Sequence, residues 1–231
     1  MYTEKHVILD LAGVPNGKWL DIGELIPRVH YVKDHVHFDK HGVKKFLTSL
    51  KAYNPHHETR VFVDCKILET PTQAYNRIRA IAEHGVDAIS IHLSGGERMI
   101  NAALRAVRDA ATGTRIWGVT TLSSTPDLPL HTVEVRARAT AAWEWGIHAV
   151  IAPGFFVDEL VNLHPRIVAT GIRSNGVPPG DHGWPMEPAK AISSGATYIV
   201  IGGEVTGDPD PAAALDRIEH QLAEAPTAPA A

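Results

Sequence analysis

Eight short apolar runs rich in β-branched residues, separated by segments with helical periodicity, constrain the fold of this chain more than any other feature. This alternation is typical of successive βα units, because sandwiches lack the intervening helices and bundles lack the strands. The expected strands are 6–11, 28–33, 60–66, 87–93, 115–121, 148–152, 166–170 and 197–202. The expected helices include 39–51, 72–84, 96–111, 131–145, 187–194 and 215–223. Eight such units predict an α/β fold, a (β/α)8 TIM barrel.

Length and composition fit one barrel of this kind. The chain has 231 residues, of which 44% are apolar, and eight βα units use about this length for a single core. We therefore expect one barrel domain over residues 1–224. The last segment, 225–231, contains only Ala, Pro and Thr and is predicted to be a disordered tail.

The composition also argues against several classes of partner. The formal net charge is −4, and no basic cluster of the kind that binds nucleic acid is present. No stretch is long and apolar enough to cross a membrane, and residues 1–6 lead into an apolar strand without a signal-peptide core. A single cysteine, Cys65, excludes an internal disulfide. We expect a cytoplasmic protein that binds neither nucleic acid nor membrane.

The third expected strand carries an acid and a base two residues apart, Asp64 and Lys66. Residues i and i+2 of a strand point to the same side, so both side chains are expected to face one space, with Cys65 packed on the other side. Charged groups are costly to bury unless they pair or perform chemistry. The pair alone is therefore consistent with an internal salt bridge or with a catalytic site.

Polar residues stand at the ends of other expected strands as well. In a (β/α)8 barrel the active site lies at the carboxyl ends of the strands and in the loops that follow them. The residues at those positions include Asp10, Lys33, Glu69, His92, Ser94, 120–124, Arg173 and Glu204. A purely structural barrel has little reason to collect charged and hydroxyl residues at one rim, so the pattern favours catalysis.

Residues 64–71 read Asp-Cys-Lys-Ile-Leu-Glu-Thr-Pro, and further blocks follow a matching order at 7–12, 30–33, 85–96, 118–124, 170–182 and 195–203. Together these blocks resemble the orotidine 5'-monophosphate decarboxylase family, and 64–71 is similar to its D-x-K-x-x-D-I-P signature. The resemblance covers nearly the whole chain. It implies a barrel enzyme that removes carbon dioxide from a pyrimidine nucleotide with neither a metal nor another cofactor.

The resemblance also implies roles for individual residues. Lys66 would donate the proton that replaces carbon dioxide, and Asp64 would face the carboxylate of the substrate. Lys33 would fix Asp64 and the ribose. Asp10 would hold the ribose hydroxyls, and Ser124 would bind the amide edge of the pyrimidine.

Three positions depart from the family pattern. Glu69 replaces an aspartate that in the family reaches across a dimer interface, which implies a homodimer with shared active sites. His182 replaces a glutamine that bridges phosphate and base, and Gly203 replaces an arginine that binds the 5'-phosphate. The expected substitutes are the backbone N–H groups of Gly202 and Gly203, together with the side chain of His182 or Arg173.

These changes lie on the phosphate side, whereas the lysines and aspartate of the reaction centre remain. The sequence therefore predicts a working decarboxylase with altered phosphate recognition. Three alternatives stay open: a decarboxylase of another carboxylated nucleoside or nucleotide, a Mg²⁺-dependent sugar-phosphate relative, and a non-catalytic nucleotide-binding homologue. A Schiff-base aldolase that uses Lys66 is disfavoured, because Asp64 two residues away keeps a lysine protonated.

Other conspicuous residues receive structural interpretations. The chain has 14 histidines but no H-E-x-x-H motif or cysteine-containing ligand set, so we expect no metal site. His92 is expected to be a hydrogen-bonded packing residue, and Trp143, Trp145 and Trp184 are expected to pack. Residues 174–183 have the glycine and proline content of a mobile lid.

Overall fold

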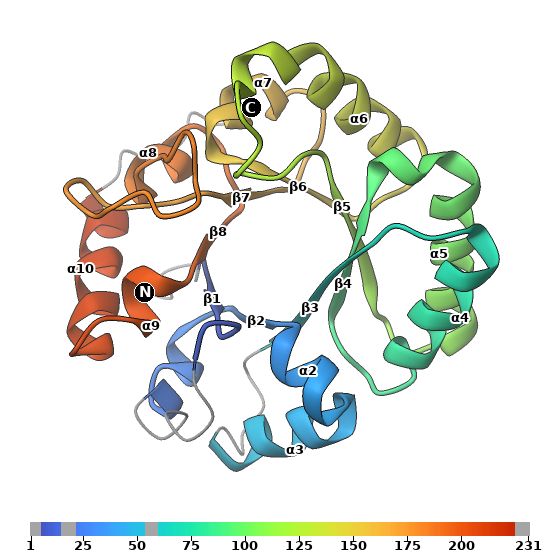
Figure 1. Ribbon diagram of the computed structural model, residues 1–231, viewed down its shortest axis with the longest axis horizontal. Coiled ribbons are helices and arrows are strands. Elements are labelled where there is room, and N and C mark those ends of the chain that lie inside the picture. The colour runs from blue at the N-terminus through green and yellow to red at the C-terminus, as the bar shows by residue number, and fades with distance from the viewer. Residues whose placement is uncertain (1–5, 15–21, 54–59, 225–231) are drawn as a thin grey trace.

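The computed structural model describes residues 6–14, 22–53 and 60–224, which form a closed barrel of eight parallel strands surrounded by helices (Figure 1). Each strand pairs with the next one along the chain, and the last pairs with the first to close the ring. The strands are β1 (Val7–Asp10), β2 (Tyr31–Asp34), β3 (Arg60–Ile67), β4 (Ala88–His92), β5 (Arg115–Val119), β6 (Ala149–Pro153), β7 (Ile167–Thr170) and β8 (Tyr198–Ile201). The predicted (β/α)8 TIM barrel is confirmed.

Helices follow the strands and cover the outside of the barrel (Figure 1). The α-helices are α2 (Val36–His41), α3 (Val43–Tyr53), α4 (Pro71–Ala82), α5 (Gly96–Ala110), α6 (Thr132–Glu144), α7 (Val157–Leu160), α8 (Pro188–Ser193), α9 (Gly203–Thr206) and α10 (Pro211–Glu224). Short 3₁₀ helices are η1 (Ile26–Arg28), η2 (Leu93–Gly95), η3 (Leu128–His131) and η4 (Gly154–Phe156). None of the helices in the described ranges is both long and apolar enough to span a membrane.

Two apolar layers stabilise the barrel. One lies between the strands and the surrounding helices, and the other fills the barrel interior. In the interior, the Trp117 ring centroid lies 5.0 Å from that of Tyr31 and 4.6 Å from that of Phe62. Side chains alternate between the two layers along each strand, because successive residues of a strand point to opposite faces. The packed interior leaves the two ends of the barrel for polar residues.

The expectation of one helix over 39–51 is wrong. The chain forms α2, turns at Gly42 and begins α3 at Val43. Gly42 has a φ of +79°, a backbone conformation that residues with a Cβ rarely adopt. Its N–H donates to the carbonyl of Phe38 at 2.8 Å, which ends α2 in the manner of a glycine cap.

The second expected strand starts too early. Arg28 lies in the 3₁₀ helix η1, after Pro27, and its guanidinium pairs with Asp216 and Glu219 of α10 at 2.5 and 2.7 Å. The ends of the other strands coincide with the expected ones or differ from them by one or two residues. The short helices α7 and α9 carry too few residues to show a periodic pattern in the sequence. The predicted tail, 225–231, lies outside the described residues and stays a prediction.

Candidate active site

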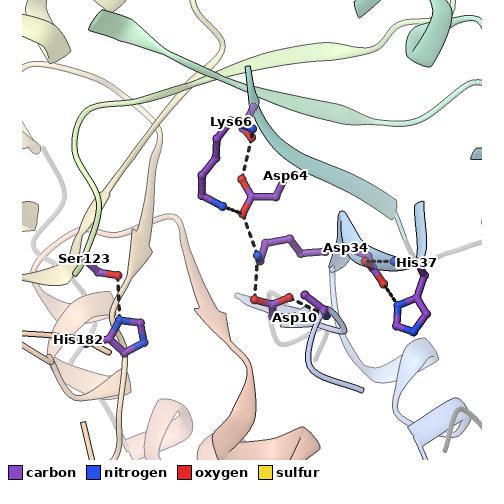
Figure 2. Close-up of polar contacts among 10 residues, drawn as sticks. Asp10, Asp34, His37, Asp64, Lys66, Ser123 and His182 are labelled. Atoms are coloured by element: carbon purple, nitrogen blue, oxygen red, sulfur yellow. Dashed lines mark hydrogen bonds and ion pairs between the residues drawn. The ribbon is translucent and has the colours of Figure 1, made fainter. Parts of the chain in front are cut away.

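A row of alternating charges crosses the carboxyl ends of the first three strands (Figure 2). The Nζ atom of Lys33 lies 2.8 Å from Oδ2 of Asp10 and 2.8 Å from Oδ2 of Asp64. The Nζ atom of Lys66 lies 2.6 Å from the same oxygen of Asp64. The side chains of Lys33 and Asp64 are each 7% exposed, whereas that of Lys66 is 36% exposed. The row therefore ends in a lysine that a ligand can reach.

The strand pairing explains why these side chains meet. In the parallel pair of β1 and β2, Asp10 stands beside Lys33, and β3 is the next strand in the ring. Asp10, Lys33 and Asp64 each follow, two residues later, a side chain that packs in the barrel interior: Ile8, Tyr31 and Phe62. All three therefore point inward at the carboxyl end of the barrel.

Lys66 reaches Asp64 by a different route from the one the sequence suggests. The pairing of β3 with β4 shifts register between Val63 and Ile67, as in a β-bulge, and Lys66 has a φ of +45°. Such a φ is uncommon for a residue with a Cβ and costs free energy that the surrounding contacts must offset. The prediction that both side chains face one space is confirmed, but regular strand alternation is not the reason. Cys65 packs against the outer apolar layer, as predicted.

Ser90 of β4 is a site residue that sequence reasoning missed. Its hydroxyl donates to Oδ1 of Asp64 at 2.7 Å and accepts the backbone N–H of Lys66 at 2.9 Å. Ser90 is fully buried. One side chain thus orients Asp64 and also holds the strained backbone of Lys66. A serine in an otherwise apolar strand, two residues before His92, was the available signal.

The electrostatics of the row favour its charged state. Burial alone would raise the pKa of Asp64, but the charges and hydrogen bonds of Lys33 and Lys66 outweigh it and hold that pKa well below its usual range. Burial would lower the pKa of Lys33, but Asp64 and Asp10 raise it overall. At neutral pH the site therefore presents a buried, fixed carboxylate between two ammonium groups.

We expect Ser90→Ala to lower turnover by about 10- to 100-fold, because Asp64 and Lys66 lose the group that positions both. The substitution also leaves the N–H of Lys66 without its partner, at a cost of about 1–3 kcal/mol in the free energy of unfolding. Steady-state kinetics and thermal unfolding would measure the two effects. Thr114→Val is the matched control, because it removes a buried hydroxyl bonded to the carbonyl of Val86 outside the charged row. Equal turnover losses in both variants would contradict a positioning role for Ser90.

Asp34 and His37 form a second buried pair, which no sequence motif indicates (Figure 2). Oδ2 of Asp34 lies 2.5 Å from Nδ1 of His37, and Oδ1 accepts the backbone N–H of His37 at 3.1 Å. Asp34 follows Lys33 directly, on the opposite face of β2. The pair joins the end of β2 to the first turn of α2.

Glu69 lies after β3, where its carboxylate pairs with the guanidinium of Arg77 at 2.8 Å. The side chain of Glu69 is 29% exposed, and Arg77 belongs to α4 of the same chain. The predicted contact of Glu69 with a second subunit stays a prediction.

A second polar contact lies across from the charged row, between Ser123 and His182 (Figure 2). The hydroxyl of Ser123 lies 2.8 Å from Nδ1 of His182, and the carbonyl of Ser123 accepts the N–H of Gly183 at 3.2 Å. These contacts tie the expected lid, 174–183, to the loop after β5. Burial, and then the charge of Arg173, lower the pKa of His182, which favours the neutral form of the ring. Ser124, the predicted pyrimidine contact, is exposed beside them.

Arg173 and the two glycines of the expected phosphate site occupy the neighbouring strand ends. Arg173 is half-buried, and its Nη1 donates to the carbonyl of Ile172 at 2.8 Å. Gly202 lies against Asp10, because a Cβ at this glycine would stand 3.3 Å from that of Asp10. A Cβ at Gly203 would meet no atom within 4 Å. The space beside Gly203 is therefore open.

The three tryptophans that are expected to pack differ in burial, and Trp143 and Trp184 pack at the surface against the rings of His164 and Phe155. Trp143 and Trp184 are 58% and 44% exposed, so neither is a core residue, whereas Trp145 packs against the outer apolar layer. His92 is half-buried, and burial followed by the charge of Lys66 lowers its pKa. Within the ranges that the structure describes, no group of three or more His, Cys, Asp or Glu side chains is arranged to hold a metal ion.

Comparisons with known proteins agree with this geometry. The family model described as "Orotidine 5'-phosphate decarboxylase / HUMPS family" matches residues 20–218. A protein of Nitratidesulfovibrio vulgaris named orotidine 5'-phosphate decarboxylase is 34% identical over 178 residues, which cover 71% of this chain and 76% of that protein. A protein of the same name from Moorella thermoacetica is 33% identical over 180 residues, 71% of each chain.

Solved structures support the fold. The crystal structure of orotidine 5'-phosphate decarboxylase from Lactobacillus acidophilus matches with a TM-score of 0.74 at 24% identity, covering 94% of this chain and 99% of that one. The corresponding structure from Pyrococcus horikoshii has a TM-score of 0.74 at 20% identity, with the same coverage. The family model spans most of the chain, and the relatives share a third of their aligned residues with it. The chain therefore belongs to the orotidine 5'-phosphate decarboxylase / HUMPS family.

Proposed function

We propose that this protein converts orotidine 5'-monophosphate to uridine 5'-monophosphate and carbon dioxide without a metal or another cofactor. The observation that carries the proposal is the row of Asp10, Lys33, Asp64 and Lys66 at the carboxyl end of the barrel. The names of the curated relatives, which describe a carboxy-lyase, support it. We also propose that the enzyme acts in the cytoplasm.

Lys66 is the proposed acid of the reaction. Loss of carbon dioxide breaks the bond between C6 of the pyrimidine and its carboxylate carbon, and the electron pair of that bond stays on C6. The ammonium of Lys66 stabilises the developing negative charge and then transfers a proton to C6. Lys66 regains a proton from solvent, because its side chain is 36% exposed.

Asp64 is the proposed partner of the substrate carboxylate. The Asp64 carboxylate is held ionised and fixed by Lys33, Lys66 and Ser90. Its negative charge therefore repels the carboxylate of the substrate. Departure of neutral carbon dioxide relieves the repulsion. The same contacts place the Lys66 ammonium before the reaction begins, so the site needs no reorganisation to stabilise the carbanion.

The remaining site residues are assigned to substrate binding. Asp10 is proposed to accept hydrogen bonds from the ribose hydroxyls. One of its carboxylate oxygens contacts the ammonium of Lys33, and the other accepts the N–H of Ala12. Ser124 is proposed to bind the amide edge of the pyrimidine, because it is exposed beside the contact of Ser123 with His182.

The phosphate side supports altered recognition. Gly202 and Gly203 are proposed to offer backbone N–H groups to the 5'-phosphate, with additional contacts from the side chains of Arg173 and His182. Because Gly203 leaves open space where the family pattern has a guanidinium, a carboxylated nucleoside without a 5'-phosphate is the second candidate substrate.

Glu69 supports a proposal about assembly. We expect a homodimer in which Glu69 exchanges its contact with Arg77 for the active site of the second subunit. The pair is accessible to such an exchange, because the Arg77 and Glu69 side chains are 41% and 29% exposed. Exposed ion pairs of this kind contribute at most about 1 kcal/mol, which an interface can offset.

We expect turnover of orotidine 5'-monophosphate, followed by ultraviolet absorbance, to survive EDTA. The reason is that the Lys66 ammonium supplies the positive charge that a metal ion supplies in other sites. Turnover that requires added Mg²⁺ would favour the sugar-phosphate branch of the family. Binding without turnover would favour a non-catalytic homologue, and turnover of only the dephosphorylated nucleoside would support the second candidate.

We expect Gly203→Arg to lower the KM for orotidine 5'-monophosphate by about tenfold or more, because a charge-assisted contact to the 5'-phosphate is worth about 1.5–3 kcal/mol. The open space at Gly203 accommodates a side chain, and its φ lies outside the left-handed region. Gly203→Ala is the matched control and should leave KM unchanged. The same KM in the arginine and alanine variants would show that the phosphate does not lie beside Gly203.

A further inference from the structure

The interior of the barrel ends in basic residues at the mouth opposite the active site. Ile8, Phe62, Trp117 and Val168 of the odd-numbered strands all pack in the interior. Side chains two residues earlier share their inward direction. Those positions are occupied by His6, Arg60, Arg115 and Arg166, a set that we name the basic ring.

The members of the basic ring lie close to one another. Burial raises the pKa of the Tyr31 hydroxyl, and the positive charges of Arg60 and Arg115 both act to lower it. Burial is the main cause of the lowered pKa of His148, and the charges of Arg115 and Arg166 both lower it further. Arg115 therefore has Arg60 on one side and Arg166 on the other, and all three residues are exposed to solvent.

Among the described residues, no carboxylate lies within 4.0 Å of the guanidinium of Arg60, Arg115 or Arg166. Asp87 is the acidic side chain that Arg60 and Arg115 affect: burial raises its pKa, the two arginines oppose that rise, and its Oδ2 accepts the N–H of Val61 at 2.8 Å. Concentrated positive charge thus stands at one mouth of a chain whose net charge is −4.

Tyr31 supplies an independent sign of a missing partner. The side chain is fully buried, and its hydroxyl has no hydrogen bond of normal geometry in the described part of the chain, although the guanidinium of Arg60 lies close enough to lower its pKa. Buried hydroxyl groups are normally bonded, because an unsatisfied one carries a desolvation cost. The guanidinium of Arg60 stands over the Tyr31 ring at 5.8 Å from its centroid, and its Nη1 lies 2.7 Å from Nε2 of His30. The unpartnered hydroxyl therefore lies next to the basic ring.

We propose that the basic ring and the Tyr31 hydroxyl form a binding site for a small multivalent oxyanion of the phosphate class. Guanidinium groups match phosphate oxygens in geometry and charge, and three of them around one axis suit a ligand with several anionic oxygens. The hydroxyl of Tyr31 would donate to an oxygen of the bound anion. His6 completes the ring and is tied to the carbonyl of Thr197 through Nδ1 at 3.0 Å.

This site is separate from the proposed active site and does not depend on the proposed function. Arg60 and Asp64 lie on the same strand four residues apart, a rise of roughly 13 Å along the barrel. The aromatic layer of Tyr31, Phe62 and Trp117 fills the space between the two ends. An anion in the basic ring therefore cannot contact the charged row.

Calorimetric titration with inorganic pyrophosphate, in EDTA and about 0.15 M NaCl to screen diffuse attraction, tests the proposal. Saturating uridine 5'-monophosphate would occupy the opposite end of the barrel. We expect wild-type protein to bind one pyrophosphate, and Arg115→Gln and Arg166→Gln to weaken this binding by about tenfold or more. Arg98→Gln is the matched control, since Arg98 is an exposed arginine on α5.

Tyr31→Phe provides the second test, because it removes only the unpartnered hydroxyl. We expect it to keep or raise the thermal unfolding temperature without ligand and to weaken pyrophosphate binding. Two results would overturn the proposal: no binding by wild-type protein at this salt concentration, or equal affinity in the Arg115, Arg166 and Arg98 variants. Turnover of orotidine 5'-monophosphate should be unchanged in Arg115→Gln, which separates failure at this site from failure at the active site.

Discussion

Lys66→Ala is expected to lower turnover of orotidine 5'-monophosphate by about 10⁴-fold or more, because one group both stabilises the carbanion and supplies its proton. Its Nζ is the exposed end of the charged row, 2.6 Å from Asp64. Alanine also removes one of the two cations that keep Asp64 ionised. Steady-state assays at high enzyme concentration would measure the loss, and the variant would also exclude a contaminating host enzyme.

Lys66→Arg separates the two parts of that role. An arginine keeps the positive charge near Asp64 but does not release a proton at neutral pH, since a guanidinium is far more basic than an ammonium. We expect Lys66→Arg to remain nearly as inactive as the alanine variant. Lys190→Ala, which removes an exposed lysine of α8, is the control and should be fully active. Substantial activity in Lys66→Arg would reduce the role of Lys66 to electrostatic stabilisation alone.

Lys33→Met is expected to lower the free energy of unfolding by about 3–5 kcal/mol and to abolish measurable turnover. The substitution removes the cation between Asp10 and Asp64 and leaves the buried Asp64 with Lys66 as its one lysine. Removing one partner of a buried ion pair costs about this much free energy, because the other charge stays buried. Denaturant unfolding followed by circular dichroism would measure it. Arg136→Met is the control, because its pair with Glu159 is exposed and should be worth less than about 1 kcal/mol.

The same pair predicts how stability depends on pH. The folded pKa of Asp64 is depressed, so its contribution is present above the ordinary aspartate pKa of about 4 and is lost as the pH falls through the folded value. The folded pKa of Lys33 is raised, so its contribution is present below about pH 10 and is lost as the pH rises further. Wild-type protein should lose more stability than Lys33→Met between pH 5 and pH 2, to the extent that Lys33 lowers the pKa of Asp64. Parallel curves for the two proteins would contradict the coupling.

Much of the fold could be predicted from the sequence. Eight alternating strand and helix patterns are local signals, and they identify the barrel because parallel strands joined by helices have few ways to pack. Element ends were less predictable. The break at Gly42 depends on a backbone angle that the helical periodicity of 39–51 does not reveal, and η1 depends on how Arg28 pairs with α10.

The candidate site was predictable where a residue's role follows from its type and its place at a strand end. Asp10, Lys33, Asp64 and Lys66 satisfy both conditions and meet in the structure. Ser90 satisfies them less clearly, because a buried serine is more often a packing residue. Its hydrogen bonds to Asp64 and to the N–H of Lys66 lie where β3 changes register beside β4.

The amino-acid sequence by itself determined the barrel, the strand ends that carry charge, and the family, since each of these depends on residue type and periodicity along the chain. The tertiary structure decided which side chains touch. Lys66 has a strained backbone beside a bulge, and Ser123 contacts His182 although 59 residues separate them in the sequence. The hydroxyl of Tyr31 is buried without a hydrogen bond of normal geometry. Such contacts follow from the register of neighbouring strands and the paths of their loops, which no local pattern encodes.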